Sequence, residues 1–315
     1  MKTLLNALLA SAFLLAGASV AQAADKEIAV IVKTANSDFW QNVKKGATDG
    51  VADLKGYTTT FQGGASDTDL AGQVALVENA INRKVAGIVL APSDPDALIP
   101  ALKKAWEAKI PVVLIDSAAA ESGKNYYQSF LATDNKLAGE LCAKALIAKI
   151  GTEGKIAIMS YTAGSGSEIG RVGGFKDYIE KHSKLKIVGP FYSNSQMGTA
   201  LNQTTDVLAA NPDLKGIFGA NEPTAIGMGR ALVQSGKAGK VVAIGFDGNG
   251  DLQRFVKDGT IEAIAVQSAY QMGKLGVQTA VEVSQGKKVP KFRDTGVVMV
   301  NKANIDSPEA KNVLY

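Results

Sequence analysis

The 315-residue sequence contains one cysteine, Cys142, and one histidine, His182. A lone cysteine cannot form an internal disulfide, and nucleophilic catalysis normally needs a base such as histidine beside a serine or cysteine. His182 lies among charged residues at a predicted helix end, and Cys142 lies in an apolar helical pattern. We therefore expect a surface histidine, a core thiol, no cofactor, no bound metal and no enzymatic activity.

Long hydrophobic runs are absent beyond the first residues. Lys2 precedes an apolar stretch from Leu4 to Val20, which ends in Ala21-Gln22-Ala23. This pattern is typical of a secretory signal peptide spanning residues 1–23, whereas a membrane-spanning helix would be longer and more uniformly apolar. No cysteine lies at the predicted cleavage point, so we expect a soluble periplasmic protein that begins near Ala24. Export without disulfides is common for bacterial proteins of this size.

Blocks of like charge are also absent. The 34 basic and 30 acidic residues give a formal net charge of +4, and they are scattered along the chain. Scattered lysines and arginines do not form a nucleic-acid-binding patch, so no nucleic-acid partner is expected. The length left after residue 23 suggests about two domains, each with its own core.

Short β-branched runs alternate with amphipathic helical patterns through the rest of the chain. The predicted strands are 28–32, 58–61, 85–90, 112–115, 156–160, 187–192, 217–220, 241–246 and 263–267. The predicted helices are 39–54, 70–82, 95–108, 136–150, 168–181, 199–209, 224–235, 250–257 and 271–284. Such βαβ alternation predicts an α/β fold, and the number of elements favours two doubly wound parallel sheets over one.

Five predicted strands end in polar residues. These are Lys33, Asp116, Asn221, Asp247 and Gln267. A polar residue at one strand end is ordinary loop chemistry, but open parallel sheets bind ligands beyond the carboxyl ends of their strands. Their joint placement predicts a shared polar cleft.

Two glycine-rich segments resemble cofactor or metal loops only superficially. Residues 164–170 have the spacing G-x-G-x-x-x-G, which differs from the dinucleotide-binding fingerprint, and no acidic residue ends the next strand. Residues 247–251 begin like a calcium loop, but Leu252 stands where a sharp turn needs glycine and Asp258 where a bidentate glutamate is needed. Neither segment predicts a bound cofactor or cation.

Asp116 and Asp247 leave two functions open. Facing carboxylates could hydrolyse a glycoside, but ionised carboxylates that bind hydroxyl pairs need no special pKa, so we favour binding. Phe39 and Trp40 open the first predicted helix beside this cleft. Trp40 continues the apolar stripe of that helix, whereas Phe39 is expected to face the cleft, where an aromatic ring can pack on the C–H face of a sugar.

The residues resemble the ribose-type periplasmic binding proteins of sugar ABC transporters from residue 28 to about 301. Seven segments carry the resemblance in the order found in that family: 32–40, 87–94, 111–116, 132–135, 171–175, 218–221, and 244–248 followed by 266–267. The resemblance implies a monomer that encloses a monosaccharide or sugar alcohol by hinge closure and delivers it to an inner-membrane permease. LacI-like repressors share this fold, but they need an N-terminal helix-turn-helix where this chain has a predicted signal peptide.

The resemblance also implies domain boundaries. It predicts one lobe from residues 24–133 plus 268–296 and another from residues 134–267 plus 297–315. The three hinge crossings are expected near residues 133–134, 267–268 and 295–296.

Carried over by position, the resemblance implies specific ligand contacts. Phe39 and Trp40 would sandwich the sugar ring, and Asp116 and Asp247 would accept hydroxyl protons. Asn221 and Gln267 would both donate and accept hydrogen bonds.

Three departures from the ribose pattern point to another ligand. Lys33 replaces a small hydroxyl residue, Ser117 replaces an arginine, and Ile169 falls where a second ligand-binding arginine is expected, while Arg171 matches a neighbouring arginine of the family. Losing two bidentate donors and gaining one flexible ammonium should change ligand identity. We expect another pentose, a ketose or a short polyol, and the alternative is a cyclic sugar-derived signalling molecule.

Overall fold

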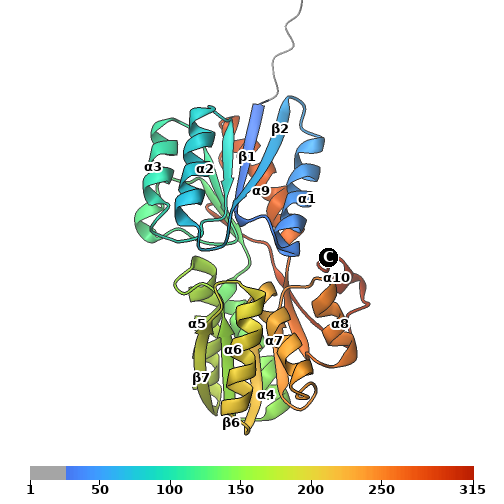
Figure 1. Ribbon diagram of the computed structural model, residues 1–315. Helices are drawn as coiled ribbons and strands as arrows, with labels where there is room; N and C mark the ends of the chain where they lie inside the picture. The colour runs from blue at the N-terminus through green and yellow to red at the C-terminus, as the bar shows by residue number, and fades with distance from the viewer. Residues whose placement is uncertain (1–25) are drawn as a thin grey trace, which may run out of the picture.

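The computed structural model describes residues 26–315, which form two lobes stacked end to end (Figure 1). The predicted signal peptide, residues 1–23, lies outside the described residues. Each lobe contains a six-stranded sheet, with strand orders β11-β5-β4-β3-β1-β2 and β12-β10-β9-β8-β6-β7. Helices cover both faces of each sheet, as the alternating pattern predicted.

The first lobe is an all-parallel doubly wound sheet. Its strands are β1 (Lys26–Thr34), β2 (Tyr57–Gly64), β3 (Gly87–Leu90), β4 (Val112–Ile115), β5 (Ser129–Ala132) and β11 (Phe292–Asp294). Its helices are α1 (Asp38–Ala52), α2 (Leu70–Asn82), α3 (Ile99–Glu107), the short η1 (Glu121–Gly123) and α9 (Ala269–Ser284). One apolar core joins the sheet to α1 and α9, and a second joins its other face to α2 and α3.

The second lobe repeats this architecture with one antiparallel edge, where β12 pairs with β10. Its strands are β6 (Glu153–Ser160), β7 (Lys184–Tyr192), β8 (Leu214–Gly219), β9 (Val242–Phe246), β10 (Ala263–Gln267) and β12 (Val297–Asn301). Its helices are α4 (Asn135–Ile150), α5 (Gly166–His182), α6 (Met197–Ala210), α7 (Glu222–Gln234), α8 (Gly250–Asp258) and α10 (Pro308–Lys311). Two apolar cores again flank the sheet.

Within residues 26–315 the chain passes between the two sheets three times. The passages lie between β5 and α4, between β10 and α9, and between β11 and β12. The first lobe is therefore completed by a segment that comes late in the sequence. Because both sheets point the carboxyl ends of their parallel strands at this junction, their strand exits meet between the lobes.

Glycines bring the helices behind the cleft into close contact. A Cβ atom on Gly46 of α1 would lie 1.9 Å from the carbonyl oxygen of Tyr270 of α9, and one on Gly273 would lie 2.0 Å from that of Val43. The second lobe uses the same device, since a Cβ on Gly139 of α4 would lie 2.0 Å from the carbonyl oxygen of Arg171 of α5. Side chains larger than glycine would separate these helices and shift the site residues that they carry.

The predicted elements are largely found, with differences at the lobe junction. Strands β5, β11 and β12 were missed because two of them are only three or four residues long and β11 is largely exposed. Helix α3 begins at Ile99 rather than at Pro95, because the Asp94 carboxylate accepts hydrogen bonds from the Asp96 and Ala97 amides and holds a turn there. The predicted strands are all parallel, and β12, which was not predicted, pairs antiparallel with β10.

The two residues singled out for their rarity occupy the expected places. Cys142 is fully buried in the core of the second lobe, where burial raises the pKa of its thiol to about 12. His182 is exposed at the end of α5, and its Nδ1 atom contacts the carbonyl oxygen of Tyr178. No helix among residues 26–315 is long and apolar enough to cross a membrane.

Candidate ligand-binding site

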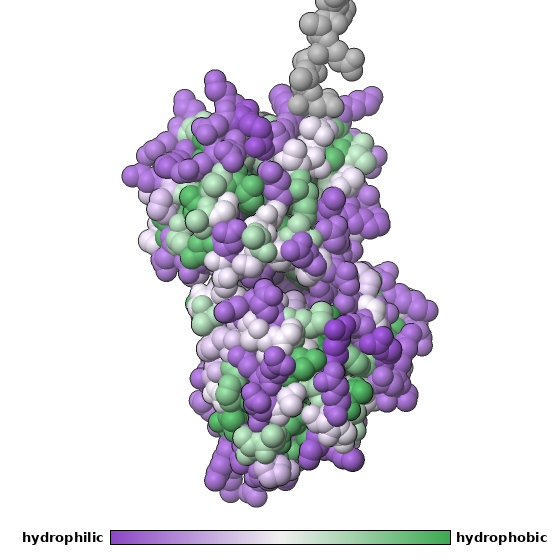
Figure 2. Space-filling model, viewed as in Figure 1, coloured by the Kyte–Doolittle hydropathy of each residue, from purple (hydrophilic) through white to green (hydrophobic). Residues whose placement is uncertain are grey.

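A cavity of about 470 Å³ lies between the lobes and is lined by both of them. Figure 2 shows the constriction between the two lobes, with hydrophilic side chains along it. The first lobe contributes Lys33, Thr34, Asn36, Ser37, Asp38, Phe39, Trp40, Ala65, Ser66, Asp67 and Asp116. The second contributes Tyr161, Ser167, Arg171, Ser195, Gln196, Met197, Asn221, Glu222, Pro223, Ile226, Asp247, Asn249, Asp251 and Gln267. Of the nine residues predicted from the sequence, Ser117 does not line this cavity.

Asp116 and Asp247 lie at matching positions in the two lobes. Each directly follows the end of a buried strand, and each has a left-handed backbone, with φ of 60° and 74°. The Asp116 amide donates to Leu131 O at 3.1 Å, and the Asp247 amide donates to Ala265 O at 2.8 Å. Left-handed backbone is costly for residues other than glycine and is concentrated at functional sites. The neighbouring strand in each sheet holds the aspartate in this conformation.

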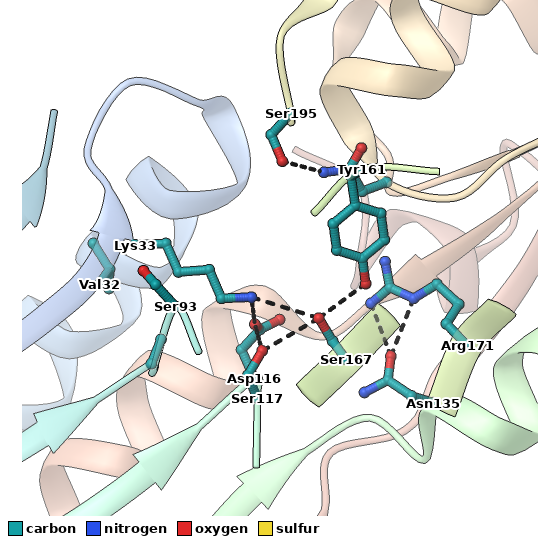
Figure 3. A network of polar contacts seen from close by, with 12 residues as sticks. Val32, Lys33, Ser93, Asp116, Ser117, Asn135, Tyr161, Ser167, Arg171 and Ser195 are labelled. Carbon is teal, nitrogen blue, oxygen red and sulfur yellow. Dashed lines mark hydrogen bonds and ion pairs between the residues drawn. The ribbon is translucent and has the colours of Figure 1, made fainter. Parts of the chain in front are cut away.

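In the first lobe, Asp116 is paired with a cation. The Lys33 ammonium lies 3.1 Å from Asp116 Oδ2, and both side chains are about 5% exposed (Figure 3). Ser117, instead of reaching the cavity, donates its hydroxyl to the same oxygen at 2.7 Å. Ser117 and Lys33 also approach Ser167 of the second lobe, at 3.2 and 3.5 Å. The Tyr161 hydroxyl donates to Ser167 at 2.9 Å, so this network crosses the cleft.

In the second lobe, Asp247 is held by neutral donors. Gln267 Nε2 donates to Asp247 Oδ1 at 2.9 Å, and the Glu222 amide donates to Oδ2 at 3.0 Å. Burial raises the pKa of Asp247 to about 6, although the Arg171 guanidinium opposes this shift. Gln267 Oε1 is buried at the cavity wall without a hydrogen-bond partner among the described residues, so it can accept a hydroxyl from a ligand.

Arg171 lines the cavity, and each of its three guanidinium nitrogens donates to the protein. Its Nε and Nη2 atoms donate to Asn135 Oδ1 at 3.1 and 2.8 Å, and Nη1 donates to Ala220 O at 2.7 Å. The guanidinium also stacks 3.6 Å above the Phe246 ring centroid. Arg171 therefore holds α4, α5 and the end of β8 together and supplies positive charge near Asp247, while its fixed donors leave it little freedom to grip a ligand.

Phe39 and Trp40 do not form the predicted sandwich. Their ring centroids are 4.8 Å apart with the planes at 81°, so the rings contact each other edge to face and leave no room for a sugar between them. Both belong to the first lobe's core and keep only a small exposed fraction at the cavity. Consecutive helical residues point in different directions, which is why two neighbours cannot present parallel faces.

Asn221 caps a helix and also reaches a cavity residue. Its side-chain oxygen accepts from the Thr224 amide at the start of α7, and its Nδ2 atom donates to Ser195 Oγ at 3.0 Å. In an analogous way Asn249 caps α8 by accepting from Leu252 and donates to Asp38 Oδ2 of α1 at 3.0 Å. The cap of α8 thus contacts the start of α1 in the other lobe.

Glu222 joins the lobes most directly. The Phe39 amide at the start of α1 donates to Glu222 Oε1 at 3.2 Å, and the Tyr315 hydroxyl donates to Oε2 at 2.9 Å. Burial and the nearby Asp247 raise the pKa of Glu222 to about 8. The Phe39 amide is free for this contact because the helix cap Ser37 accepts from Trp40 instead.

Sequence reasoning missed several cavity residues. Glu222 directly follows Asn221 beyond a strand end, so it could have been predicted in the same way as Asn221. Asp67, Ser167 and Ser195 lie in loops or at a helix start rather than directly after predicted strands, and no local pattern distinguishes them. Among residues 26–315 no cluster of three or more histidine, cysteine or acidic side chains could hold a metal ion.

The sequence matches the periplasmic binding protein domain over residues 28–288. The chain belongs to this family. It is 33% identical to the ribose import binding protein of Salmonella typhimurium over 90% of this chain and 93% of that protein. It is 30% identical to the D-allose-binding periplasmic protein of Escherichia coli over 87% of this chain and 91% of that protein. The fold class and the family predicted from the sequence are confirmed.

Solved structures agree with the fold. An ABC transporter solute binding protein from Agrobacterium vitis with bound D-fucose is 71% identical, with a TM-score of 0.91, covering 92% of this chain and 100% of that one. A carbohydrate transporter solute binding protein from Agrobacterium radiobacter in complex with D-arabinose is 37% identical, with a TM-score of 0.89, covering 93% and 100%. Proteins of this periplasmic family bind substrates for ABC transporters and are not enzymes.

Proposed function

We propose that this periplasmic sugar-binding component of an ABC importer takes a neutral aldose in its cleft, with D-fucose or a sugar of the same ring configuration as the first candidate. The observation that carries the proposal is a pair of aspartates with left-handed backbone conformation, Asp116 and Asp247, which line one cavity from opposite lobes. Carboxylates on both sides of a small cavity can accept hydroxyl protons from both faces of one sugar. The 71% identical protein with bound D-fucose supports this choice.

The charge of the cavity favours a neutral ligand. Its lining includes six acidic residues, Asp38, Asp67, Asp116, Glu222, Asp247 and Asp251, but only two basic ones, Lys33 and Arg171. Lys33 is paired with Asp116, and all three guanidinium nitrogens of Arg171 donate to the protein. An anionic ligand would therefore meet more acidic than basic side chains, and both basic ones already contact protein groups, whereas hydroxyl groups find many acceptors.

The cavity lining also includes apolar side chains. Phe39, Met197, Pro223 and Ile226 line it together with the polar groups. Sugars present C–H groups on their ring faces, and a 6-deoxy sugar adds a methyl group that apolar side chains can cover. A volume of about 470 Å³ lies within the usual range for small-molecule sites.

The three chain passages between the lobes are the proposed hinge. Opening around them would expose the cavity, and closure would bring Ser117 and Lys33 to Ser167, and the Phe39 amide to Glu222. Lobe boundaries at residues 133–134, 267–268 and 295–296, together with cleavage of a signal peptide after residue 23, belong to the same proposal. Scattering should show compaction on adding a tight ligand, and mass spectrometry of periplasmic protein should show a chain lacking Lys2.

The test is a thermal-shift and calorimetric panel of D-fucose, D-galactose, L-fucose, D-arabinose, D-ribose and D-allose. We expect D-fucose to stabilise the protein by about 2.7 kcal/mol at a hundredfold excess over Kd. D-galactose differs from D-fucose only by a 6-hydroxyl and should bind more weakly if the apolar side chains of the cavity cover the methyl group of D-fucose. Stabilisation by amino acids or nucleotides but by no sugar would refute the proposal.

A further inference from the structure

Asp67 lies on the loop between β2 and α2 and lines the cavity, although it does not follow a strand end directly. Its side chain is buried, and its Oδ1 atom has no hydrogen-bond partner among the described residues. Buried polar atoms are almost always hydrogen-bonded, so each exception needs an explanation. Of the buried side-chain atoms in residues 26–315 that lack a partner, only those of Asp67 and Gln267 belong to residues lining the cavity.

Asp67 is not explained by an ion pair. The only lysine at this wall, Lys33, places its ammonium 3.1 Å from Asp116 Oδ2, and no ion pair within 4 Å to Asp67 is found in the described residues. Burial raises the pKa of Asp67, and the Lys33 ammonium offsets part of this shift from a greater distance. Within residues 26–315 the buried carboxyl group therefore has no cation in contact with it, and its Oδ1 atom has no hydrogen-bond partner.

The opposite wall holds Ser195 in an unusual conformation. Asn194 and Ser195 have left-handed backbones, with φ of 53° and 58°. Ser195 Oγ accepts from Asn221 Nδ2, which leaves its own proton to point toward Asp67, and a side-chain hydrogen bond from Ser195 lowers the pKa of that carboxyl. Strained backbone at a cavity wall is typical of residues placed for ligand contact. Asp67 and Ser195 thus face each other across the cleft from different lobes.

We propose that Asp67 is a specificity-determining residue that accepts one sugar hydroxyl in addition to those taken by Asp116 and Asp247. This inference rests on the proposed function, because it requires a sugar in the cleft. The alternative is that Asp67 only balances the charge of Lys33. The two differ in one respect: a hydrogen bond singles out one hydroxyl of the ligand, whereas charge balance does not.

The experiment combines Asp67→Ala with single-deoxy analogues of the sugar that binds best. Calorimetry should show a 10- to 100-fold loss of affinity for the parent sugar, the loss expected for one hydrogen bond to a charged group. One deoxy analogue should bind wild-type protein weakly but lose little more in Asp67→Ala, because the hydroxyl and its acceptor are then both missing. Asp67→Asn, which keeps the shape and an acceptor oxygen, should lose less affinity for the parent sugar. The same deoxy analogue should again be the one that loses little more.

Asp53→Ala is the matched control, because it removes an exposed carboxylate from the same lobe outside the cavity. It should leave all affinities unchanged. Equal losses for every analogue in the Asp67 variants, or no loss, would overturn the inference while leaving sugar binding intact. If Asp67→Ala does not fold, as judged by circular dichroism, Asp67→Asn is tested instead, and a loss of affinity that depends on one ligand hydroxyl supports the inference in the same way. Failure of wild-type protein to bind any sugar would overturn both proposals together.

Discussion

The two lobes hold equivalent aspartates in the same backbone conformation but neutralise them differently. Asp116 contacts the Lys33 ammonium, whereas Asp247 accepts hydrogen bonds from Gln267 and the Glu222 amide. A cation removes the electrostatic cost of a buried carboxylate, but neutral donors do so only in part, and the pKa of Asp247 accordingly rises to about 6. The fold therefore fixes where the carboxylates stand, while neighbouring residues decide how strongly each competes for a ligand hydroxyl.

Asp247 should be the more important of the pair for binding. Each oxygen of Asp247 accepts one hydrogen bond from a neutral donor and keeps a second lone pair for a ligand, whereas Oδ2 of Asp116 already contacts the Lys33 ammonium and the Ser117 hydroxyl. We expect Asp247→Ala to weaken sugar binding about a hundredfold or more, at roughly 1.5–3 kcal/mol for each of two lost charge-assisted bonds.

Calorimetry on folded Asp247→Ala protein measures this loss. Asp206→Ala, which removes an exposed carboxylate on α6 of the same lobe, is the control and should bind normally. If Asp116→Ala proved more damaging than Asp247→Ala, the proposed difference between the lobes would be wrong. An unchanged Kd in Asp247→Ala would reject its ligand-binding role and leave only its contacts with Gln267 and Glu222.

The Lys33–Asp116 pair offers a sharper test of the same comparison. Lys33→Met and Asp116→Asn should each weaken binding, and the double variant should lose less than the sum, with a coupling of about 0.5–3 kcal/mol. The physical reason is that either single change leaves a buried group without its partner. The same cycle on Arg171→Met and Asp247→Asn should couple more weakly, since no ion pair joins those two side chains in the described residues. Equal coupling energies in both cycles would contradict the proposal that Asp116 is paired with a cation and Asp247 is not.

Much of the fold was predictable because buried parallel strands and amphipathic helices leave strong local patterns. Strand β10 was predicted with its observed bounds, and most helices within about two residues. The missed strands are β11 and β12, which are sheet edges, and the short β5 next to β11, and for these tertiary pairing rather than local sequence decides the structure.

The site was predictable where it follows strand ends and not elsewhere. Asp116, Asp247 and Gln267 project from predicted strands, so topology alone brings them to one cavity. Asp67 and Ser195 reach it from loops, whose conformations carry no periodic signal. The edge-to-face contact of Phe39 and Trp40 also differs from the prediction, because consecutive helical residues point in different directions and cannot present parallel ring faces.

The buried acids of the second lobe should make stability depend on pH. Burial raises the pKa of Glu222 from an ordinary value of 4.5 to about 8. The folded protein therefore retains a proton that the unfolded chain releases, so this stabilisation is complete below about pH 4.5 and is lost as pH rises through about 8. With saturating sugar to keep the cleft closed, we expect Tm to fall by several degrees across this window.

Glu222→Gln keeps the shape of the side chain but cannot titrate, so its Tm profile should be flatter between pH 6 and 8. Below pH 6 some slope should remain, because Asp247 also has a raised pKa and acts in the same direction. Exposed Glu180→Gln, on α5, should retain the wild-type profile. A wild-type Tm that rises with pH across this window would show that Glu222 is ionised throughout and that its contact with Phe39 is charge-assisted.

Tyr315 should contribute the smallest of these effects, and one confined to the closed state. Tyr315 belongs to the second lobe, where its amide donates to Gly248 O at 3.2 Å and its hydroxyl donates to Glu222 Oε2 at 2.9 Å. Its ring packs against the first lobe's core, so the hydroxyl bond holds the ring in a contact between the lobes. Tyr315→Phe removes one hydrogen bond of about 0.5–1.5 kcal/mol, which should speed sugar dissociation about 2- to 10-fold with little change in association.

Tyr270→Phe is the matched control for Tyr315→Phe, because its hydroxyl donates to Asp49 at 2.9 Å within the first lobe. Removing that bond leaves the contacts between lobes intact, so stopped-flow dissociation should match wild type. Faster dissociation in both variants would mean that loss of a hydroxyl loosens the first lobe generally. Faster dissociation in Tyr315→Phe alone would assign the effect to the lost contact with Glu222. Glu222 would then be the residue of the second lobe that helps to keep the cleft closed.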